Sequence, residues 1–189
     1  MRELAAPHRH LTIDEYLALE SASEIRHEYV GGMLYAMAGA TQRHNRIAMN
    51  VAAQLWNGAR GTDCAVYGSD MLVRIGDNAC YYPDAVVVCD PADEEPMYLT
   101  QPCLIVEVSS PSTASADRRD KLMGYCAIES LQEYLIVFQD EQRVIRHFRD
   151  QKGAWWHEEL APGRMLHLRC PEMLLNVAEI YEGVDFSEA

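Results

Sequence analysis

The sequence predicts a mixed α/β domain built on one central sheet. Two apolar runs, Ala85–Cys89 and Cys103–Val108, are short and rich in β-branched residues, as buried strands are. From residue 41 to residue 58, apolar side chains instead recur every three or four positions, as they do on one face of a helix. Because these signals alternate along a chain of 189 residues, we expect a single domain spanning 1–189.

The N-terminal part, residues 12–38, is predicted to form a helix followed by a hairpin. Thr12-x-x-Glu15 has the spacing of a capping box, so we expect a helix from about residue 12 to 20. Gly31-Gly32 then separates two extended runs, and glycines suit the tight turn of a hairpin. That turn pairs Glu28 with Tyr35.

Strand and helix signals continue through the rest of the chain. In order, we expect a helix at 41–58, strands at 64–75, 81–89 and 103–109, a helix at 115–128, strands at 133–138, 144–149 and 155–160, and a closing helix at 171–182. A break at Pro111-Ser112-Thr113 should end the third strand. Residues 41–160 form the predicted core.

Composition places the chain among ordinary globular proteins. Apolar residues make up 49% and charged residues 24%. No apolar run approaches the roughly 18 residues of a membrane span, and the N-terminus lacks the apolar region of a signal peptide. We therefore expect a cytoplasmic protein without a membrane segment. The six cysteines follow no zinc-binding spacing, so we expect all of them to be reduced packing residues.

The net charge of −13 argues against a broad nucleic-acid-binding surface, because neutralised phosphates supply most non-specific affinity. Much of the acidity, however, is concentrated in residues 90–95 and 179–188. Basic residues gather elsewhere, at 43–46, 118–121 and 143–152. A local basic patch is compatible with this distribution.

Two carboxylates interrupt the apolar strands. Asp84 precedes the first strand and Glu107 lies within the second, and such groups are rarely buried without compensation for their charge. A divalent cation shared by both would supply that compensation. The alternatives are that Asp84 caps a turn and that Glu107 pairs with a buried arginine, for which Arg74 and Arg118 are the candidates.

Lys121 is the candidate third member of this site. It shares a face of the predicted helix with Asp117 and Tyr125, and the turn after residue 109 directs that helix back toward the strand end. An ammonium group beside a metal-bound water can orient the water and stabilise charge that develops on phosphate. The alternative is a solvated lysine paired with Asp117. We expect Tyr125 to pack in the core.

The motifs PDAVVV, PCLIVEVSSPST and D-x-x-x-K-x-x-x-Y together resemble the "putative restriction endonuclease" family of the PD-(D/E)XK nuclease superfamily. The resemblance extends from TIDEYLAL to SLQEYLIVFQDEQRVIRHFR. It implies a restriction-endonuclease-like core, in which a central mixed sheet is flanked by helices and preceded by the N-terminal helix and hairpin.

The resemblance also implies roles for individual residues. Asp84, Glu107 and the carbonyl of Val108 would hold Mg²⁺, with Mn²⁺ able to substitute. The usual lysine of the superfamily would occupy position 109, which is Ser109 here. The resemblance therefore implies a lysine that has migrated to the next helix, and Lys121 fits that place.

Three further residues are accessory candidates, each with a simpler explanation. Glu28 matches an upstream glutamate that the superfamily often places near the metal, although hairpin glutamates are usually solvated. His44 could contact phosphate from a helix start, or serve as a hydrogen-bonded structural group. Asp70 is expected to form an ion pair with Arg74 rather than to take part in catalysis.

These observations predict a Mg²⁺-dependent endonuclease that hydrolyses DNA phosphodiester bonds. The alternative is a catalytically inactive nuclease-fold module that binds DNA or protein, which Ser109 and the net charge of −13 would favour. A hydrolase of another phosphate ester is a third possibility. Apolar surface on the hairpin and the closing helix leads us to expect a homodimer.

Overall fold

The computed structural model describes residues 10–90, 95–109 and 115–187, and the side chains within them except those of 115–118. The predicted break at 111–113 lies outside these residues. Along the chain the elements are α1 (Ile13–Ala22), β1 (His27–Val30), β2 (Met33–Ala36), α2 (Gln42–Ala59), β3 (Ala65–Gly68), β4 (Leu72–Ile75), β5 (Ala79–Tyr81), β6 (Ala85–Val88), β7 (Tyr98–Leu99), β8 (Leu104–Ser109), α3 (Ser115–Cys126), β9 (Glu133–Phe138), β10 (Val144–Arg149), β11 (Trp155–Leu160), β12 (Met165–Arg169), β13 (Glu172–Asn176) and α4 (Val177–Ile180).

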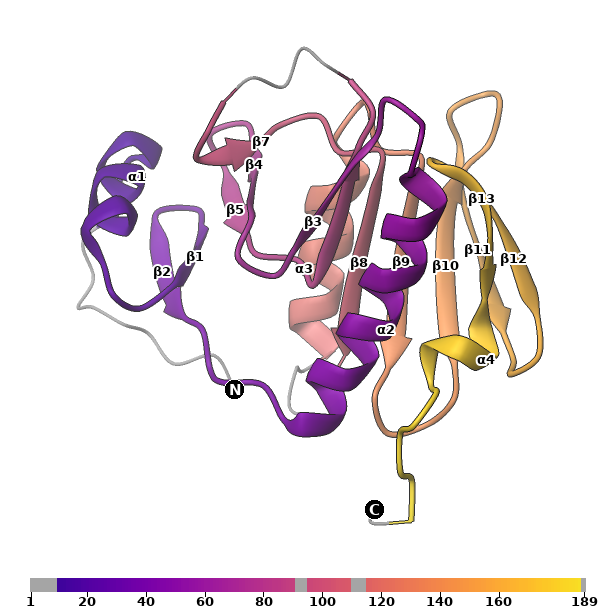
Figure 1. Ribbon diagram of the computed structural model, residues 1–189. Coiled ribbons are helices and arrows are strands. Elements are labelled where there is room, and N and C mark those ends of the chain that lie inside the picture. Colours follow the sequence, from indigo (N-terminus) through magenta and orange to yellow (C-terminus); the bar gives the residue numbers. More distant parts are fainter. Residues whose placement is uncertain (1–9, 91–94, 110–114, 188–189) are drawn as a thin grey trace.

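A six-stranded mixed sheet forms the centre of the molecule (Figure 1), as predicted. Its strand order is β11-β10-β9-β8-β6-β3. β8 and β9 are parallel, whereas their neighbours in the sheet pair antiparallel. Parallel neighbours need a crossover connection, and α3 lies in the one between β8 and β9. This crossover carries Lys121 to the sheet.

A second, five-stranded sheet, β2-β1-β5-β4-β7, was not expected. The predicted strands 64–75 and 81–89 each divide between the two sheets, because the chain turns within them. At the first turn, the amide of Met71 donates to the carbonyl of Gly68 at 3.1 Å. At the second turn lies Pro83, which has no amide to donate to a strand ladder. That turn brings Asp84 to the start of β6.

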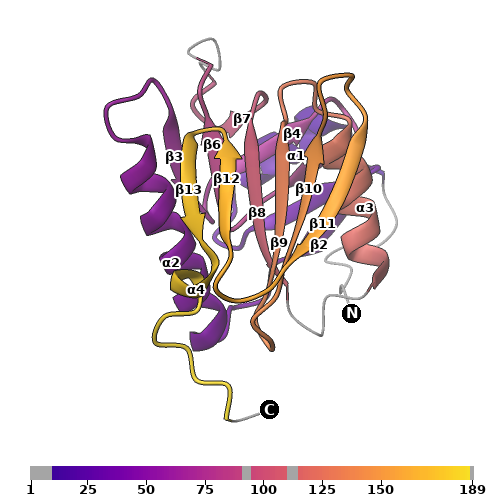
Figure 2. The ribbon, with the colours of Figure 1, turned by 90° about the vertical axis from the view of Figure 1, so that its right-hand side faces the viewer.

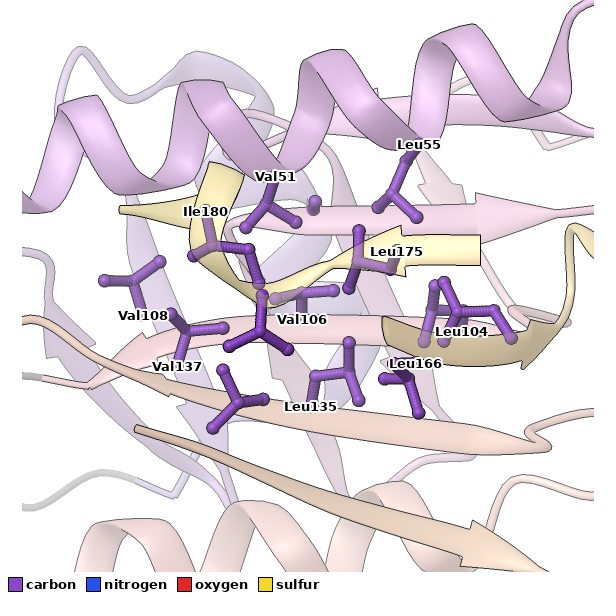
Figure 3. Close-up of a cluster of buried hydrophobic side chains, with 14 of the residues drawn as sticks. Val51, Leu55, Leu104, Val106, Val108, Leu135, Val137, Leu166, Leu175 and Ile180 are labelled. Carbon is purple, nitrogen blue, oxygen red and sulfur yellow. The ribbon is translucent and has the colours of Figure 1, made fainter. Parts of the chain in front are cut away.

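Hydrophobic clusters cover both faces of the central sheet. On one face, Leu104, Val106 and Val108 of β8 pack with α2, α4 and the β12–β13 hairpin (Figures 2 and 3). On the other face, Ile105 of β8 packs with α3 and with side chains of the second sheet. Helix α1 covers the far side of that second sheet. The alternation along β8 therefore turns Glu107 toward α3 and the second sheet.

The N-terminal predictions are confirmed. Thr12 and Glu15 form a reciprocal capping box at the start of α1. The β1–β2 hairpin turns at Gly31 and Gly32, whose φ angles of 54° and 90° are positive, and it pairs Glu28 with Tyr35. The hairpin register therefore determines which way Glu28 faces.

The predicted closing helix at 171–182 is wrong in its first half. Residues Glu172–Asn176 form β13, which pairs antiparallel with β12, a strand that was not predicted. Burial alternates along β12, where Leu166 and Leu168 are buried and their neighbours are exposed, as in a half-buried strand. Helix α4 comprises Val177–Ile180 and is capped by the side chain of Asn176.

Four of the six cysteines are joined in disulfides, so the expectation of six reduced thiols is wrong for them. The bonds join Cys64 to Cys89 and Cys103 to Cys170, while Cys80 and Cys126 are free.

None of the helices in the described part of the chain combines the length and the apolar character that a membrane crossing requires.

The fold analysis predicts how α2 contributes to stability. Leu55 is fully buried in the hydrophobic cluster between α2 and the central sheet. Leu55→Ala should therefore lower the free energy of unfolding by about 2–5 kcal/mol. Met49, on the same helix, is 60% exposed, so Met49→Ala should change the free energy of unfolding by less than about 0.5 kcal/mol. Urea denaturation monitored by circular dichroism measures both, and equal effects would contradict the assigned face of α2.

Candidate metal centre

The two strand carboxylates lie at the same end of neighbouring strands. β6 and β8 are antiparallel with Ala85 opposite Val106, and this register places Asp84 opposite Glu107. The amide of Val108 donates to Asp84 Oδ2 at 2.7 Å. The side chains of Asp84 and Glu107 are only 13% and 14% exposed. The arrangement therefore gathers two carboxylates and the Val108 backbone in a largely buried place.

Lys121 reaches this place from α3 and contacts two carboxylates. Its Nζ lies 2.9 Å from Glu107 Oε1 and 2.8 Å from Glu28 Oε1, so it joins the central sheet to the second sheet. The hydroxyl of Tyr125, one helical turn after Lys121, donates to the same Glu107 oxygen at 2.7 Å. The alternative of a solvated Lys121 is excluded, because its side chain is 12% exposed.

Burial and charge shift the pKa values of this group. Burial raises the pKa of Glu107 to about 7, even though the ammonium of Lys121 opposes that shift. Burial would by itself lower the pKa of Lys121, but the carboxylates of Glu107 and Glu28 raise it above its ordinary value. Lys121 therefore carries a positive charge at neutral pH, and burial makes Glu107 easier to protonate than an ordinary carboxylate.

His44 approaches the same carboxylates from the first turn of α2. The helix is capped by Thr41, whose hydroxyl accepts from the His44 amide. The His44 Nε2 lies 3.5 Å from Asp84 Oδ2. Burial would lower the pKa of His44, but its contact with Asp84 raises the pKa above the ordinary value.

Asp70 lies apart from the site, and so does Arg74. The Asp70 side chain is 90% exposed and lies 3.9 Å from Arg26. The expected pair of Asp70 with Arg74 is wrong, because Arg74 instead binds Asp77 at 2.8 Å. Arg74 therefore does not neutralise Glu107, and the side chain of Arg118 lies outside the described residues. Ser109 is buried at the end of β8, two residues beyond Glu107.

Sequence reasoning missed two features of this group. Tyr125 packs edge-on against Tyr81 and Tyr134, as expected, but it also hydrogen-bonds Glu107. The spacing of Lys121 and Tyr125 on one helix face could have indicated a common partner. The contact of Glu28 with Lys121 joins distant parts of the chain, and no local pattern signals it.

The donor set fits a hard divalent cation. Asp84 and Glu107 supply carboxylate oxygens and Val108 a carbonyl, which are the ligand types that Mg²⁺ takes in proteins. Three carboxylates, those of Glu28, Asp84 and Glu107, converge with the ammonium of Lys121 and the imidazole of His44. When all three carboxylates are ionised and both Lys121 and His44 are protonated, these five groups still carry a net negative charge.

Comparison with known proteins identifies the family. A family model described as "Uma2: Putative restriction endonuclease" matches residues 13–178. Uncharacterized protein slr1290 of Synechocystis sp. is 33% identical over 184 residues, which cover 96% of this chain and 97% of that protein. Uncharacterized protein sll1609 of the same organism is 33% identical over 154 residues, covering 79% of this chain and 87% of that protein.

A solved structure shares the fold. The crystal structure of "a putative nuclease belonging to DUF820" from Anabaena variabilis aligns with a TM-score of 0.74 over 90% of this chain and 97% of that chain, at 18% identity. The predicted mixed-sheet nuclease fold is therefore confirmed. The chain therefore belongs to the Uma2 family, which is described as "Putative restriction endonuclease".

Proposed function

We propose that the protein is a Mg²⁺-dependent endonuclease that hydrolyses phosphodiester bonds of DNA. The proposal rests on one observation: Asp84, Glu107 and Lys121 lie together in one largely buried group. The two carboxylates come from adjacent strands and the lysine from the crossover helix. Membership of the family described as "Putative restriction endonuclease", and the fold shared with "a putative nuclease" from Anabaena variabilis, support a nuclease function. Mn²⁺ should substitute for Mg²⁺.

In this proposal Asp84, Glu107 and the carbonyl of Val108 hold the ion. When bound, the ion lowers the pKa of a coordinated water and stabilises negative charge on the phosphate. Asp84 is oriented for its role by the Val108 amide, and Glu107 by Tyr125. Both carboxylates are thus held in place before the ion arrives, which lowers the cost of ordering them.

Lys121 is the proposed water-positioning and charge-stabilising residue. Its ammonium hydrogen-bonds the carboxylate of Glu107. From there it can also donate to an attacking water or to a non-bridging phosphate oxygen. Because its pKa is raised, it acts as a cation and hydrogen-bond donor rather than as a general base. The carboxylate of Glu28, from the second sheet, also contacts this ammonium and helps to orient it.

His44 is the proposed contact for the substrate phosphate. It lies in the first turn of α2, where the backbone N–H groups and the helix dipole favour an anion. Its raised pKa favours the imidazolium, which can donate to a phosphate oxygen. Since the overall charge of −13 opposes DNA, such local contacts, and association into a homodimer, would have to supply much of the affinity.

A catalytically inactive nuclease-fold module is the second candidate. Ser109 in place of the usual strand lysine is the observation that favours it. Such a module would still bind DNA or a protein partner, and would leave plasmid DNA intact with either metal. Plasmid cleavage by the wild type with Mg²⁺ or Mn²⁺ separates the two candidates.

The carboxylates should be essential for cleavage. We expect Asp84→Asn and Glu107→Gln to reduce Mg²⁺- or Mn²⁺-dependent plasmid cleavage by more than about 100-fold, because each removes an anionic ligand. Asp70→Asn is the matched control, since Asp70 is exposed and lies apart from the site. Equal cleavage by the wild type and Asp84→Asn would refute the assignment, and an inactive wild type would favour the binding module.

Lys121→Gln should separate catalysis from metal binding. Loss of the ammonium should lower the cleavage rate by about 100-fold or more. Calorimetric Mn²⁺ affinity should be retained or increased, because the ammonium competes with the ion for Glu107. Lys152→Gln, at an exposed position, should match the wild type in both measurements. Full activity of Lys121→Gln would remove Lys121 from the mechanism.

Metal affinity should increase with pH. The pKa of Glu107 is raised to about 7, so its protonated form competes with the ion below that pH and the competition ends above it. One competing proton predicts about tenfold weaker Mn²⁺ binding at pH 6 than at pH 8. Calorimetric titration at the two pH values measures the ratio, and equal affinities would contradict a ligand role for Glu107.

A further inference from the structure

Four cysteines converge at the end of the central sheet opposite Asp84 and Glu107. Cys64 directly precedes β3 and Cys89 directly follows β6, where the strand register places them side by side. Cys103 directly precedes β8, and its amide donates to the carbonyl of Val87 at 2.8 Å. Cys170 lies in the turn of the β12–β13 hairpin. Four separate segments thus each bring one sulfur to the same place.

The two disulfides formed by these residues are in contact with each other. The Cys89 sulfur lies 3.1 Å from that of Cys170 and 3.6 Å from that of Cys103, although it is bonded to neither. The sulfurs of Cys64, Cys89 and Cys170 all lie within 4.8 Å of one another. Two disulfides would stabilise a fold equally well far apart. A cluster of four sulfurs is instead what a single thiolate-bound ion requires.

We propose that the reduced protein binds one Zn²⁺ ion through Cys64, Cys89, Cys103 and Cys170. Structural zinc sites hold the ion with four tetrahedral ligands at a Zn–S distance of about 2.3 Å, which spaces the sulfurs about 3.8 Å apart. The Cys89–Cys103 sulfur distance of 3.6 Å is close to that spacing, and the Cys89–Cys170 distance of 3.1 Å is shorter, so these sulfurs would move apart to admit the ion. Thiolates favour zinc over magnesium, so this centre selects a different ion from the carboxylate site.

The site has the character of a structural centre. Four protein ligands leave no position open for a substrate. Cys103 and Cys170 are 6% and 3% exposed and belong to the hydrophobic cluster under α2, while Cys64 and Cys89 are half-buried and give the ion a path from solvent. An ion here would fasten the β12–β13 hairpin to strands β3, β6 and β8.

Zinc can bind only after both disulfides have been reduced. A phosphine reductant and water convert each disulfide into two thiols, and the phosphine becomes its oxide. Four thiols then lose their protons as they bind one Zn²⁺, so that loading strengthens with pH. The proposal does not depend on nuclease activity, because Asp84 and Glu107 take no part in it.

The test uses full-length protein carrying Asp84→Asn, so that the carboxylate site does not contribute metal. After anaerobic reduction with a phosphine, Zn²⁺ is added, free metal is removed and bound zinc is counted by mass spectrometry. We expect about one ion per chain. Co²⁺ should give the intense visible bands and thiolate charge-transfer absorption of a tetrahedral tetrathiolate site, and Zn²⁺ should displace it and raise the melting temperature.

Cysteine variants decide which residues bind. Cys64→Ser, at a half-buried position beside an edge strand, and Cys170→Ser should each weaken Zn²⁺ binding by at least about tenfold and alter the cobalt spectrum. Cys126→Ser, outside the cluster, should leave both unchanged. A reduced protein that binds no zinc, a cobalt spectrum without thiolate bands, or one that Cys64→Ser does not change would overturn the proposal.

Discussion

The contact of Lys121 with both Glu28 and Glu107 is the interaction on which the arrangement of the candidate site depends. One ammonium group lies within 3 Å of carboxylates from two different sheets. Burying such charges costs several kcal/mol for each ion, and the cost is offset only when partners are well placed. Removing one partner from a buried ion pair typically destabilises a protein by about 3–5 kcal/mol. This ammonium therefore joins the two sheets and α3, in addition to the hydrophobic cluster that they share.

Local features of the sequence bring the three groups together. The alternation along β8 sends Leu104, Val106 and Val108 into the cluster beneath α2, so that Glu107 faces the other way. The parallel pairing of β8 with β9 requires a crossover, and the helix in that crossover covers the same face. Glu28 reaches this face because the hairpin turn at Gly31-Gly32 fixes its register with Tyr35.

Short-range patterns made much of the fold predictable. The capping box of α1, the hairpin register, the stripe of α2 and strands β9 to β11 each depend on nearby residues, and the structure has them as predicted. The division of 64–75 and 81–89 between two sheets was not predictable in the same way. Both segments read as continuous strands. Pro83 is a local signal for one of the two bends, but which sheet each half joins depends on tertiary packing.

The same distinction applies to the candidate site. Asp84 and Glu107 could be found because each interrupts an apolar strand, and the position of Lys121 could be expected from the turn before its helix. The partners Glu28 and Tyr125, and the pairing of Arg74 with Asp77, depend on contacts between separate elements. The convergence of the four cysteines could not be predicted at all. Each comes from a separate segment of the chain, so their spacing in the sequence forms no recognisable motif.

In the proposed mechanism a lysine on α3 takes the place of a lysine on β8, because the mechanism requires only that the ammonium lies beside the carboxylates and not that a particular element supplies it. Ser109 is buried at the end of its strand, two residues after Glu107. In a strand, residues two apart face the same side, so a lysine at 109 would extend over the face that α3 covers. Lys121 approaches that face from α3 and reaches the same carboxylate. The ammonium of Lys121 also lies over the ring of Tyr81 and beside the carboxylate of Glu28. Under the proposed function, the packing of the crossover helix would thus compensate for the absence of a lysine on β8.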